Sequence, residues 1–336
     1  MKNVVLEYVW LDGFQPQNLR SKVKVIEGWS GHPDSTPVWN FDGSSTCQAV
    51  GNDSECLLQP VRKYEYGLHP HYLVLCEVMN ADGTPHETNT RAQLRRDVSQ
   101  HTVEPEFWWG FEQEYFITSA GRPLGFPPIG MPDPQGRYYC GVGGNQVRGR
   151  ALVETHLQKC LNMGIKLTGT NAEVAIGQWE YQCFAKDTLQ ACDDLWMSRY
   201  VLHRMAEQFD CDIDLSPKPV AGDWNGSGCH TNFSNKHMRE VGGEKYFANL
   251  LESLKTRHAL HIAGYGENND QRLTGEHETQ HIETFSWGVA DRGASIRVPN
   301  VTANHGWKGY VEDRRPAANC DPYKVAMLIV ETVLDA

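Results

Sequence analysis

The chain has 336 residues, of which 40% are hydrophobic and 22% charged, an ordinary globular composition that excludes extensive disorder and collagen-like repeats. At ~150 residues per domain, this length predicts about two domains. The 31 basic and 42 acidic residues leave a net charge of -11, which is the wrong sign for a surface that binds a phosphate backbone. Nucleic acid is therefore not an expected partner, whereas surplus carboxylates are compatible with metal binding.

The first 85 residues contain short apolar stretches separated by turns, at 4–11, 22–26 and 72–78. They show almost no helical periodicity, which predicts a small β-rich domain. Turn-forming residues cluster at 80–85. We therefore expect a domain boundary there, between residues 1–85 and 86–336, without a long linker.

Beyond residue 85, helical and strand-like patterns alternate. Thr88 or Asn89 can cap a helix over 91–103, and Asp187 can cap another over 188–209. Further helices are expected at 146–163, 244–262 and 322–334, the last with proline in its first turn. Strand-like runs lie between these helices, so the larger part is predicted to be an α+β domain.

Cysteine usage and hydrophobicity predict a cytoplasmic protein. The ten cysteines include no CxxC pair, so no structural zinc site is indicated. Glu7 and Asp12 interrupt the first apolar stretch, and we expect neither a secretory leader nor a membrane span. Free thiols are typical of a reducing compartment, which favours the cytoplasm.

Glu112 and Glu114 lie in a strand expected at 108–117. Alternation places large apolar side chains on one face of this strand and the two glutamates on the other. Adjacent carboxylates on one face repel each other unless a positive charge lies over them, and a divalent cation supplies it well. A solvated strand face is the alternative, and this motif alone leaves both interpretations open.

Two further acidic motifs also allow both a metal-binding and a structural interpretation. Glu173 and Glu180 are seven positions apart, on opposite faces of a regular strand unless a bulge or turn at Gly177 brings them together. Glu312 shares a strand face with Arg314, which is also typical of a surface salt bridge. Either motif could therefore contribute metal ligands or only structural charges.

His230 follows two glycines that allow close backbone approach to a ligand. Asn225, Ser227, Asn232 and Ser234 surround it with hydrogen-bond donors. A lone histidine is often structural, but among the histidines this one is the preferred metal ligand. One imidazole among oxygen ligands suits Mg²⁺ or Mn²⁺ better than zinc or copper.

Five arginines lie close together late in the chain: Arg272, Arg292, Arg297, Arg314 and Arg315. Guanidinium groups bind carboxylates and phosphates through two parallel hydrogen bonds. Opposite a carboxylate–metal cluster they would suit phosphoryl transfer, although ordinary salt bridges would use the same residues. The sequence has neither a Walker loop nor a Rossmann fingerprint, so a nucleotide would be held mainly by metals and arginines.

Taken together and in order, six motifs resemble those of glutamine synthetase, best those of its eukaryotic-type (type II) branch. They lie at residues 39–46, 110–115, 169–174, 225–234, 272–279 and 310–316. The resemblance spans nearly the whole chain. It implies a small β-grasp domain over 1–85 and a catalytic α+β domain over 86–336, with a curved antiparallel sheet and flanking helices.

The resemblance also implies two divalent-cation sites. One would use Glu114, Glu173 and Glu180, and the other Glu112, His230 and Glu312. The ions would be Mg²⁺ or Mn²⁺, two or more in each active site, with ATP as a co-substrate. The expected substrate contacts are Asn225, Gly226, Arg272 and Arg292, and the expected nucleotide contacts are Trp108, Asn232, Ser234 and Arg297.

Four residues receive catalytic roles from the same resemblance. Arg297 and Arg314 would stabilise charge on the transferred phosphoryl group. Glu278 would lie on a flap that closes the glutamate entrance and shields the intermediate from water. Asp42 would reach the site from a neighbouring subunit, bind ammonium and remove its proton.

The implied activity is ATP-dependent ligation of ammonia to the side-chain carboxylate of L-glutamate through γ-glutamyl phosphate. The implied assembly is a decamer of two pentameric rings with active sites between subunits, and no nucleic acid or membrane partner. Two alternatives stay open, a ligase that joins glutamate to another amine and a catalytically silent structural ring. Residues 181–186 depart from the Gly-Pro that the family usually has there, which affects the expected nucleotide pocket.

Overall fold

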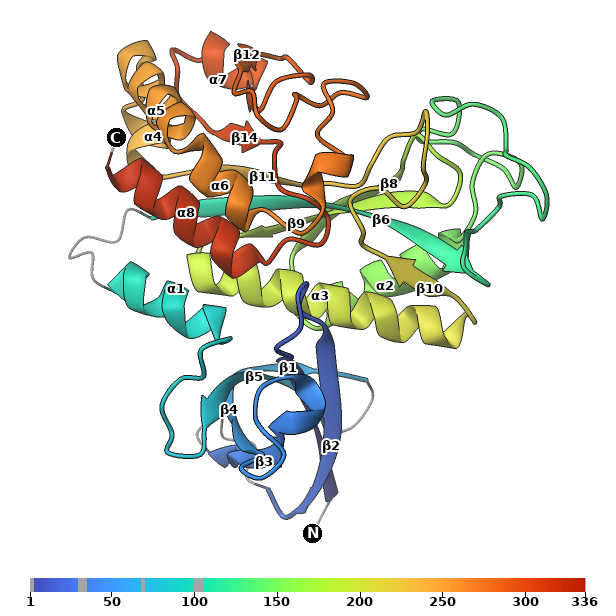
Figure 1. Cartoon of the computed structure of the whole chain (residues 1–336), viewed down its shortest axis with the longest axis vertical. Helices are drawn as coiled ribbons and strands as arrows, with labels where there is room; N and C mark the ends of the chain where they lie inside the picture. The colour runs from blue at the N-terminus through green and yellow to red at the C-terminus, as the bar shows by residue number, and fades with distance from the viewer. Residues whose placement is uncertain (1–2, 30–34, 68–69, 100–105, 336) are drawn as a thin grey trace. The chain divides into compact units, whose positions relative to one another are not determined.

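The computed structural model describes residues 3–29, 35–67, 70–99 and 106–335 and divides the chain into two compact units (Figure 1). The first unit comprises residues 1–100 and 159–165, and the second comprises residues 101–158 and 166–336. The expected boundary at residue 85 lies within the first unit's main segment and stays a prediction.

The first unit is built on a five-stranded sheet with strand order β2-β1-β5-β4-β3. The strands are β1 (Asn3–Leu11), β2 (Leu19–Glu27), β3 (Trp39–Asp42), β4 (Glu55–Glu65) and β5 (His71–Asn80), with the short helix η2 (Gly43–Thr46) after β3. The three expected strands are therefore confirmed. Buried side chains such as Leu6, Tyr8, Leu58 and Val74 form the core of this unit.

Helix α1 (Thr90–Ser99) follows the sheet in the first unit. Of the two expected caps, Asn89 is the one used, because its Oδ1 accepts a hydrogen bond from the Ala92 amide at 3.0 Å. The expected continuation of this helix to residue 103 lies outside the described residues.

The second unit contains a curved nine-stranded sheet with the path β12-β13-β14-β11-β6-β9-β8, and both β7 and β10 pair with β6 (Figure 1). All its pairs are antiparallel except β12 with β13. The strands are β6 (Trp108–Ser119), β7 (Arg122–Pro123), β8 (Leu167–Ala172), β9 (Gln178–Ala185), β10 (Asp212–Asp214), β11 (Cys229–Ser234), β12 (Trp287–Val289), β13 (Ile296–Val298) and β14 (Val311–Asp313).

The helices of the α+β architecture flank this sheet: α2 (Arg150–Asn162), α3 (Thr188–Gln208), α4 (Lys236–Glu240), α5 (Glu244–Thr256), α6 (His258–Gly264), η3 (Asn269–Gln271), α7 (Asn300–Asn304) and α8 (Pro322–Leu334). Helix α3 packs on β6 and β9 and against α8 (Figure 1). Its expected cap is confirmed, since Asp187 accepts from the Gln190 amide at 2.7 Å. Because α3 covers one face of the central strands, the other face is left for a site.

The prediction of a single helix at 244–262 is wrong, because the structure has two helices there. The chain leaves helical geometry at Arg257, with φ −94° and ψ 11°, between α5 and α6. The Arg257 side chain binds the Asp335 carboxylate at 2.9 Å just after α8. Apolar periodicity continues on both sides of this break, which is why the pattern did not reveal it.

No helix in the described part of the chain combines the length and the hydrophobicity that a bilayer span requires.

Candidate active site

Strand β6 lies between β9 and β11, and this pairing gathers acidic residues on the sheet face away from α3. Glu112 is opposite His230 on β11, and Glu114 is opposite Glu180 on β9. The alternate residues of β6, among them Phe111 and Tyr115, are fully buried. The predicted alternation is therefore confirmed, and the glutamates share the face that is left open.

Glu173 joins this group through the turn between β8 and β9. Gly177 has φ +84° in this turn, and a Cβ there would lie 2.5 Å from the Leu124 carbonyl oxygen, so glycine is required. The turn lets Glu173 and Glu180 converge although seven positions separate them. The expectation that Gly177 allows convergence is confirmed.

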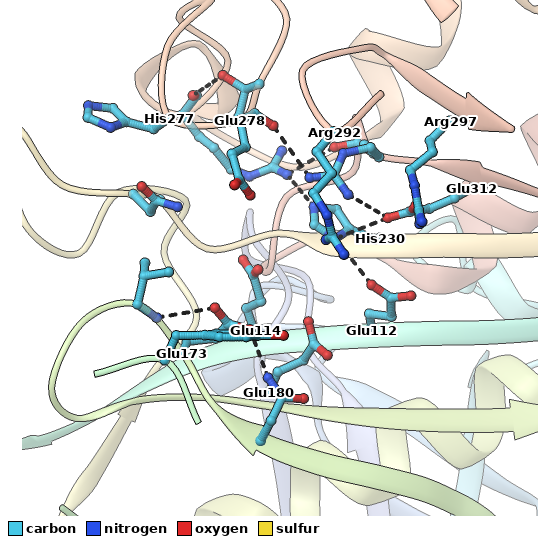
Figure 2. Close-up of a pocket in the computed structure, with 18 of the residues that line it drawn as sticks. Glu112, Glu114, Glu173, Glu180, His230, His277, Glu278, Arg292, Arg297 and Glu312 are labelled. Carbon is cyan, nitrogen blue, oxygen red and sulfur yellow. Dashed lines mark hydrogen bonds and ion pairs between the residues drawn. The ribbon is translucent and has the colours of Figure 1, made fainter. Parts of the chain in front are cut away.

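The open face forms a cavity of about 630 Å³ (Figure 2). Its wall includes all six expected metal ligands, Glu112, Glu114, Glu173, Glu180, His230 and Glu312, and also Asn225, Gly226, Arg272, Glu278, Arg292, Arg297 and Arg314. Acidic and basic side chains from segments far apart in the sequence thus meet in one pocket.

The carboxylates in this pocket are too crowded to be charged without compensation. Burial, and secondarily the charge of neighbouring carboxylates, raises the pKa of Glu173 to about 8 and that of Glu180 to about 9. Burial also raises the pKa of Glu114. A bound cation would favour the ionised forms and relieve their repulsion.

Two groups of side chains among the described residues could each hold one cation. The first is Glu114, Glu173 and Glu180, and the second is Glu112, Glu180 and His230, with ligand atoms within 4.8 Å of one another. The first coincides with an expected site, and the second has Glu180 in place of Glu312. Oxygen donors with one imidazole fit a hard divalent ion.

His230 is neutral in this environment. Burial and the nearby Arg314 charge lower the pKa of His230 well below its usual value, and neutral imidazole is the form that binds metals. Its Nδ1 lies 3.4 Å from Glu112 Oε2 and 3.6 Å from Glu312 Oε1. Its Nε2 lies 3.1 Å from a guanidinium nitrogen of Arg272.

Glu312 is fully engaged with arginines. Its Oε2 binds Arg297 at 2.7 Å, its Oε1 binds Arg314 at 2.6 Å, and its side chain is 1% exposed. The carboxylate thus lies beside the second cation group but neutralises two guanidinium groups. Its role as a metal ligand stays a prediction.

The loop that carries Glu278 closes one side of the pocket. His277 and Glu278 are both in the left-handed region, with φ +53° and +59°, a conformation that costs energy for residues other than glycine. The Glu278 side chain points into the pocket toward the acidic cluster, whereas His277 points away (Figure 2). The geometry is compatible with the expected flap.

A second cavity, of about 390 Å³, contains the expected nucleotide contacts Trp108, Asn232 and Ser234. Glu112 and Gln182 line both cavities. The Trp108 ring has Arg239 at 4.1 Å and Lys186 at 4.2 Å, which is typical of cation–π contacts. The structure therefore places a flat aromatic surface next to the acidic pocket.

Several lining residues were missed from the sequence. Gln182 and Phe184 follow Glu180 at intervals of two on β9, so alternation from Glu180 would have found both. Phe184 lies in the departing segment and stands edge-on to Trp108, with ring centroids 6.1 Å apart. Tyr139, which also lines the acidic pocket, lies outside regular structure and carried no such signal.

Asp42 lies in the first unit, at the end of β3, where it caps η2. Its carboxylate accepts hydrogen bonds from the Ser44 and Ser45 hydroxyl groups, both at 2.6 Å. These bonds lower the pKa of Asp42 and keep it ionised. Its expected role toward ammonium stays a prediction.

Comparison with known proteins adds a separate line of evidence. Residues 87–335 match the family model described as glutamine synthetase, catalytic domain. A glutamine synthetase of Bradyrhizobium diazoefficiens is 49% identical over 341 residues, which cover 99% of this chain and 97% of the relative. A glutamine synthetase of Suillus bovinus is 50% identical over 338 residues, with 99% and 94% covered. A chloroplastic glutamine synthetase of Chlamydomonas reinhardtii is 48% identical over 342 residues, with 98% and 90% covered. The chain therefore belongs to the glutamine synthetase family.

Proposed function

We infer that the protein is an ATP-dependent glutamate–ammonia ligase, which forms L-glutamine, ADP and phosphate. The observation that carries this conclusion is one pocket in which buried glutamates face a cluster of arginines, in a chain of the glutamine synthetase family. Such a pocket can hold the phosphates of ATP and an acidic amino acid together.

The chemistry needs two steps because a carboxylate is a poor electrophile. In the first, a γ-carboxylate oxygen of glutamate takes the γ-phosphoryl group of ATP, the bond to the ADP oxygen breaks, and γ-glutamyl phosphate forms. In the second, ammonia attacks the acyl carbon, the bond to the phosphate oxygen breaks, and the nitrogen gives up one proton, so that phosphate leaves as hydrogen phosphate and the amide forms. Phosphorylation thus supplies the leaving group.

Arg297 and Arg314 would stabilise phosphate charge in both steps. Both extend into the pocket from the β13–β14 region, and Arg314 is 6% exposed. In such a poorly hydrated site, a guanidinium group stabilises phosphate oxygens more strongly than in water. We propose that these two side chains hold the transferred group.

The acidic groups would hold two divalent cations, which we propose to be Mg²⁺ or Mn²⁺. When bound, such ions neutralise phosphate charge. The ligands would be Glu114, Glu173 and Glu180 for one ion, and Glu112, Glu180 and His230 for the other, with Glu312 beside it. Oxygen-rich donors and uncompensated buried charge support this assignment.

Glutamate would bind at the opposite side of the same pocket. The backbone N–H of Asn225 donates to Gln135 Oε1, and the side-chain amide of Gln135 donates to Asn225 Oδ1, both at 2.6 Å. These two hydrogen bonds fix the segment that carries Asn225. Asn225 and Gly226 would contact the amino acid, and Arg272 and Arg292 would supply positive charge. Glu278 would close the entrance and keep water from the acyl phosphate.

The nucleotide base would occupy the second cavity against Trp108, with Asn232 and Ser234 as polar contacts. Where the family usually has a small Gly-Pro segment, Phe184 forms part of this wall. The departing segment therefore makes this cavity more aromatic, and its Gln182 also lines the acidic pocket.

We propose a decamer of two pentameric rings in which Asp42 of one subunit serves the pocket of another. Its ionised carboxylate is exposed and suits a small cation such as ammonium. All ten cysteines are free, which supports the proposal that the protein works in the cytoplasm.

One assay tests the proposed function. ADP release is coupled to a spectrophotometric readout, with Mg²⁺ and ATP present, and glutamate and ammonia are added separately and together. We expect full turnover, with glutamine as the product, only when both are present. Faster turnover with methylamine or a polyamine than with ammonia would identify another amine ligase, and no γ-glutamyl phosphate formation under any condition would identify a silent ring.

A further inference from the structure

Two amide side chains connect the carboxylates of Glu173 and Glu180. The Gln182 amide nitrogen donates one hydrogen bond to Glu180 Oε1 and another to Asn171 Oδ1, the latter at 2.9 Å. The Asn171 amide nitrogen in turn donates to Glu173 Oε1 at 2.9 Å. We call the chain Glu180–Gln182–Asn171–Glu173 the amide relay.

The local backbone makes room for this relay. Asn171 on β8 is opposite Glu180 on β9, and Gln182 is opposite Gly169. A Cβ at Gly169 would lie 2.4 Å from Gln182 Oε1. The absence of a side chain at this one position therefore lets Gln182 lie across β8 and reach Asn171.

The donors of the relay point outward from Gln182 to both carboxylates. The Gln182 amide nitrogen donates to Glu180 on one side and to Asn171 Oδ1 on the other, and the Asn171 amide nitrogen donates to Glu173. Donors stabilise the ionised carboxylates, and both side chains are fixed relative to the β8–β9 hairpin. The other oxygen of Glu173 accepts the Val174 amide at 3.2 Å, so this side chain is held at both oxygens.

We propose that Asn171 and Gln182 are positioning residues for the cation group Glu114, Glu173 and Glu180. The relay holds two of the three carboxylates in ligand geometry before the cation arrives. This inference rests on the divalent-cation use in the proposed function, and it assigns a task to two residues that would not themselves bind the ion.

A purely structural role makes a different prediction. The β8–β9 hairpin is already held by its backbone pairing, and both amide side chains are only half-buried. If the amides merely stabilised the hairpin, their removal would lower the melting temperature and leave the cation affinity of the folded protein unchanged. Cation affinity therefore distinguishes the two roles.

The test measures Mn²⁺ binding to the full chain without nucleotide, by calorimetry and by the electron spin resonance of free Mn²⁺. The variants are Gln182→Met and Asn171→Leu, which keep side-chain size and remove the hydrogen bonds. Gln59→Met is the control, since the Gln59 side chain is exposed and, within the part of the chain that the structure describes, its amide binds the Pro60 carbonyl oxygen alone. Circular dichroism establishes that each variant is folded, and Gln182→Asn replaces Gln182→Met if the latter is not.

We expect each relay variant to bind Mn²⁺ at the group Glu114, Glu173 and Glu180 about 10-fold more weakly, as is typical when a hydrogen-bond partner of a ligand is removed. Gln182→Met should also weaken the second Mn²⁺, because Glu180 belongs to both groups. The double variant should bind Mn²⁺ only slightly more weakly than the single variant with the larger loss of affinity, because both substitutions break the same chain of hydrogen bonds. The control should bind as the parent does. Unchanged affinity in both folded single variants would overturn the relay, whereas a parent protein that binds no Mn²⁺ would instead overturn the proposed cation site.

Discussion

At the scale of single residues, the pocket is defined by charges that the protein alone does not balance. Glu180 belongs to both cation groups, and its pKa is raised to about 9 by burial and then by Glu112, Glu114 and Glu173. Stability and cation binding are therefore linked to the protonation of a few carboxylates.

Cation affinity should rise with pH. Because the folded-state pKa values of Glu173 and Glu180 are raised to about 8 and about 9, these two carboxyl groups hold protons in the metal-free folded protein that the unfolded chain releases. Their contribution to stability should therefore fall as pH rises from about 4.5 to about 9. A cation must displace these protons, so Mn²⁺ should bind more tightly at pH 8.5 than at pH 6.5. Calorimetry in buffers of different ionisation enthalpy measures the released protons, and a pH-independent affinity would contradict this prediction.

The shared glutamate should differ in effect from its neighbour. Glu180→Gln should weaken both cations, and Glu173→Gln only one, by on the order of 100-fold each, since loss of a ligand costs at least as much as loss of its hydrogen-bond partner. The metal-free variants should melt no lower than the parent, because glutamine cannot ionise beside the neighbouring carboxylates. Mn²⁺ stoichiometry and thermal melting check both statements. If Glu180→Gln and Glu173→Gln weakened Mn²⁺ binding at the same number of sites, Glu180 would not be a ligand of both cations.

At the scale of elements, helix α3 fixes the strand that carries the acidic face. The Arg199 guanidinium is fully buried and donates to Gln113 Oε1 at 2.8 Å, to the Cys320 carbonyl at 2.8 Å and to the Ala318 carbonyl at 3.0 Å. Gln113 lies on β6 between Glu112 and Glu114. One side chain thus ties α3, β6 and the segment before α8 together.

Arg199→Met should destabilise the protein by about 3 kcal/mol, because the Gln113 amide oxygen and the Cys320 carbonyl lose a buried donor. The Ala318 carbonyl keeps the Gln113 amide as a donor. Lys255→Met on α5 is the control, since the Lys255 side chain is exposed and forms a surface pair with Glu252 at 3.2 Å, and we expect a change below about 0.5 kcal/mol. Urea denaturation of the metal-free proteins measures both. A loss at position 199 no greater than at position 255 would contradict the role of this contact.

Much of the acidic face could be predicted from the sequence, and the reasons are physical. Strand periodicity is two, so the apolar residues of β6 determined where Glu112 and Glu114 point. The relay could not be predicted, because it depends on the register that sets Asn171 opposite Glu180. The break at Arg257 was also hidden, since neighbouring residues on both sides keep helical periodicity.

At the scale of the whole molecule, the proposed ammonium contact and the cation groups belong to different units of the chain. Asp42 lies in the first unit, whereas the acidic pocket is formed by the second. The proposed decamer would complete each pocket with Asp42 from a neighbouring subunit. A complete site would then be a property of the assembly.

Mixed oligomers test this proposal. Asp42→Ala and Glu312→Ala subunits should each be inactive alone, because each lacks one part of every site. After mixing in equal amounts and reassembly, about one quarter of the sites should contain both intact residues if subunits assort at random. Recovery of glutamine formation to about this level is the expected result. No recovery in hetero-oligomers of verified composition would contradict a shared site.

Glu312 would allow Arg297 and Arg314 to exchange one negatively charged partner for another. In this structure it keeps Arg297 and Arg314 extended over the acidic face by neutralising both. Incoming phosphate oxygens would offer these guanidinium groups an equivalent negative partner, and the carboxylate would then be free to turn to a cation. Arg297 and Arg314 would then have a negatively charged partner at every stage, Glu312 before substrate binds and phosphate oxygens afterwards.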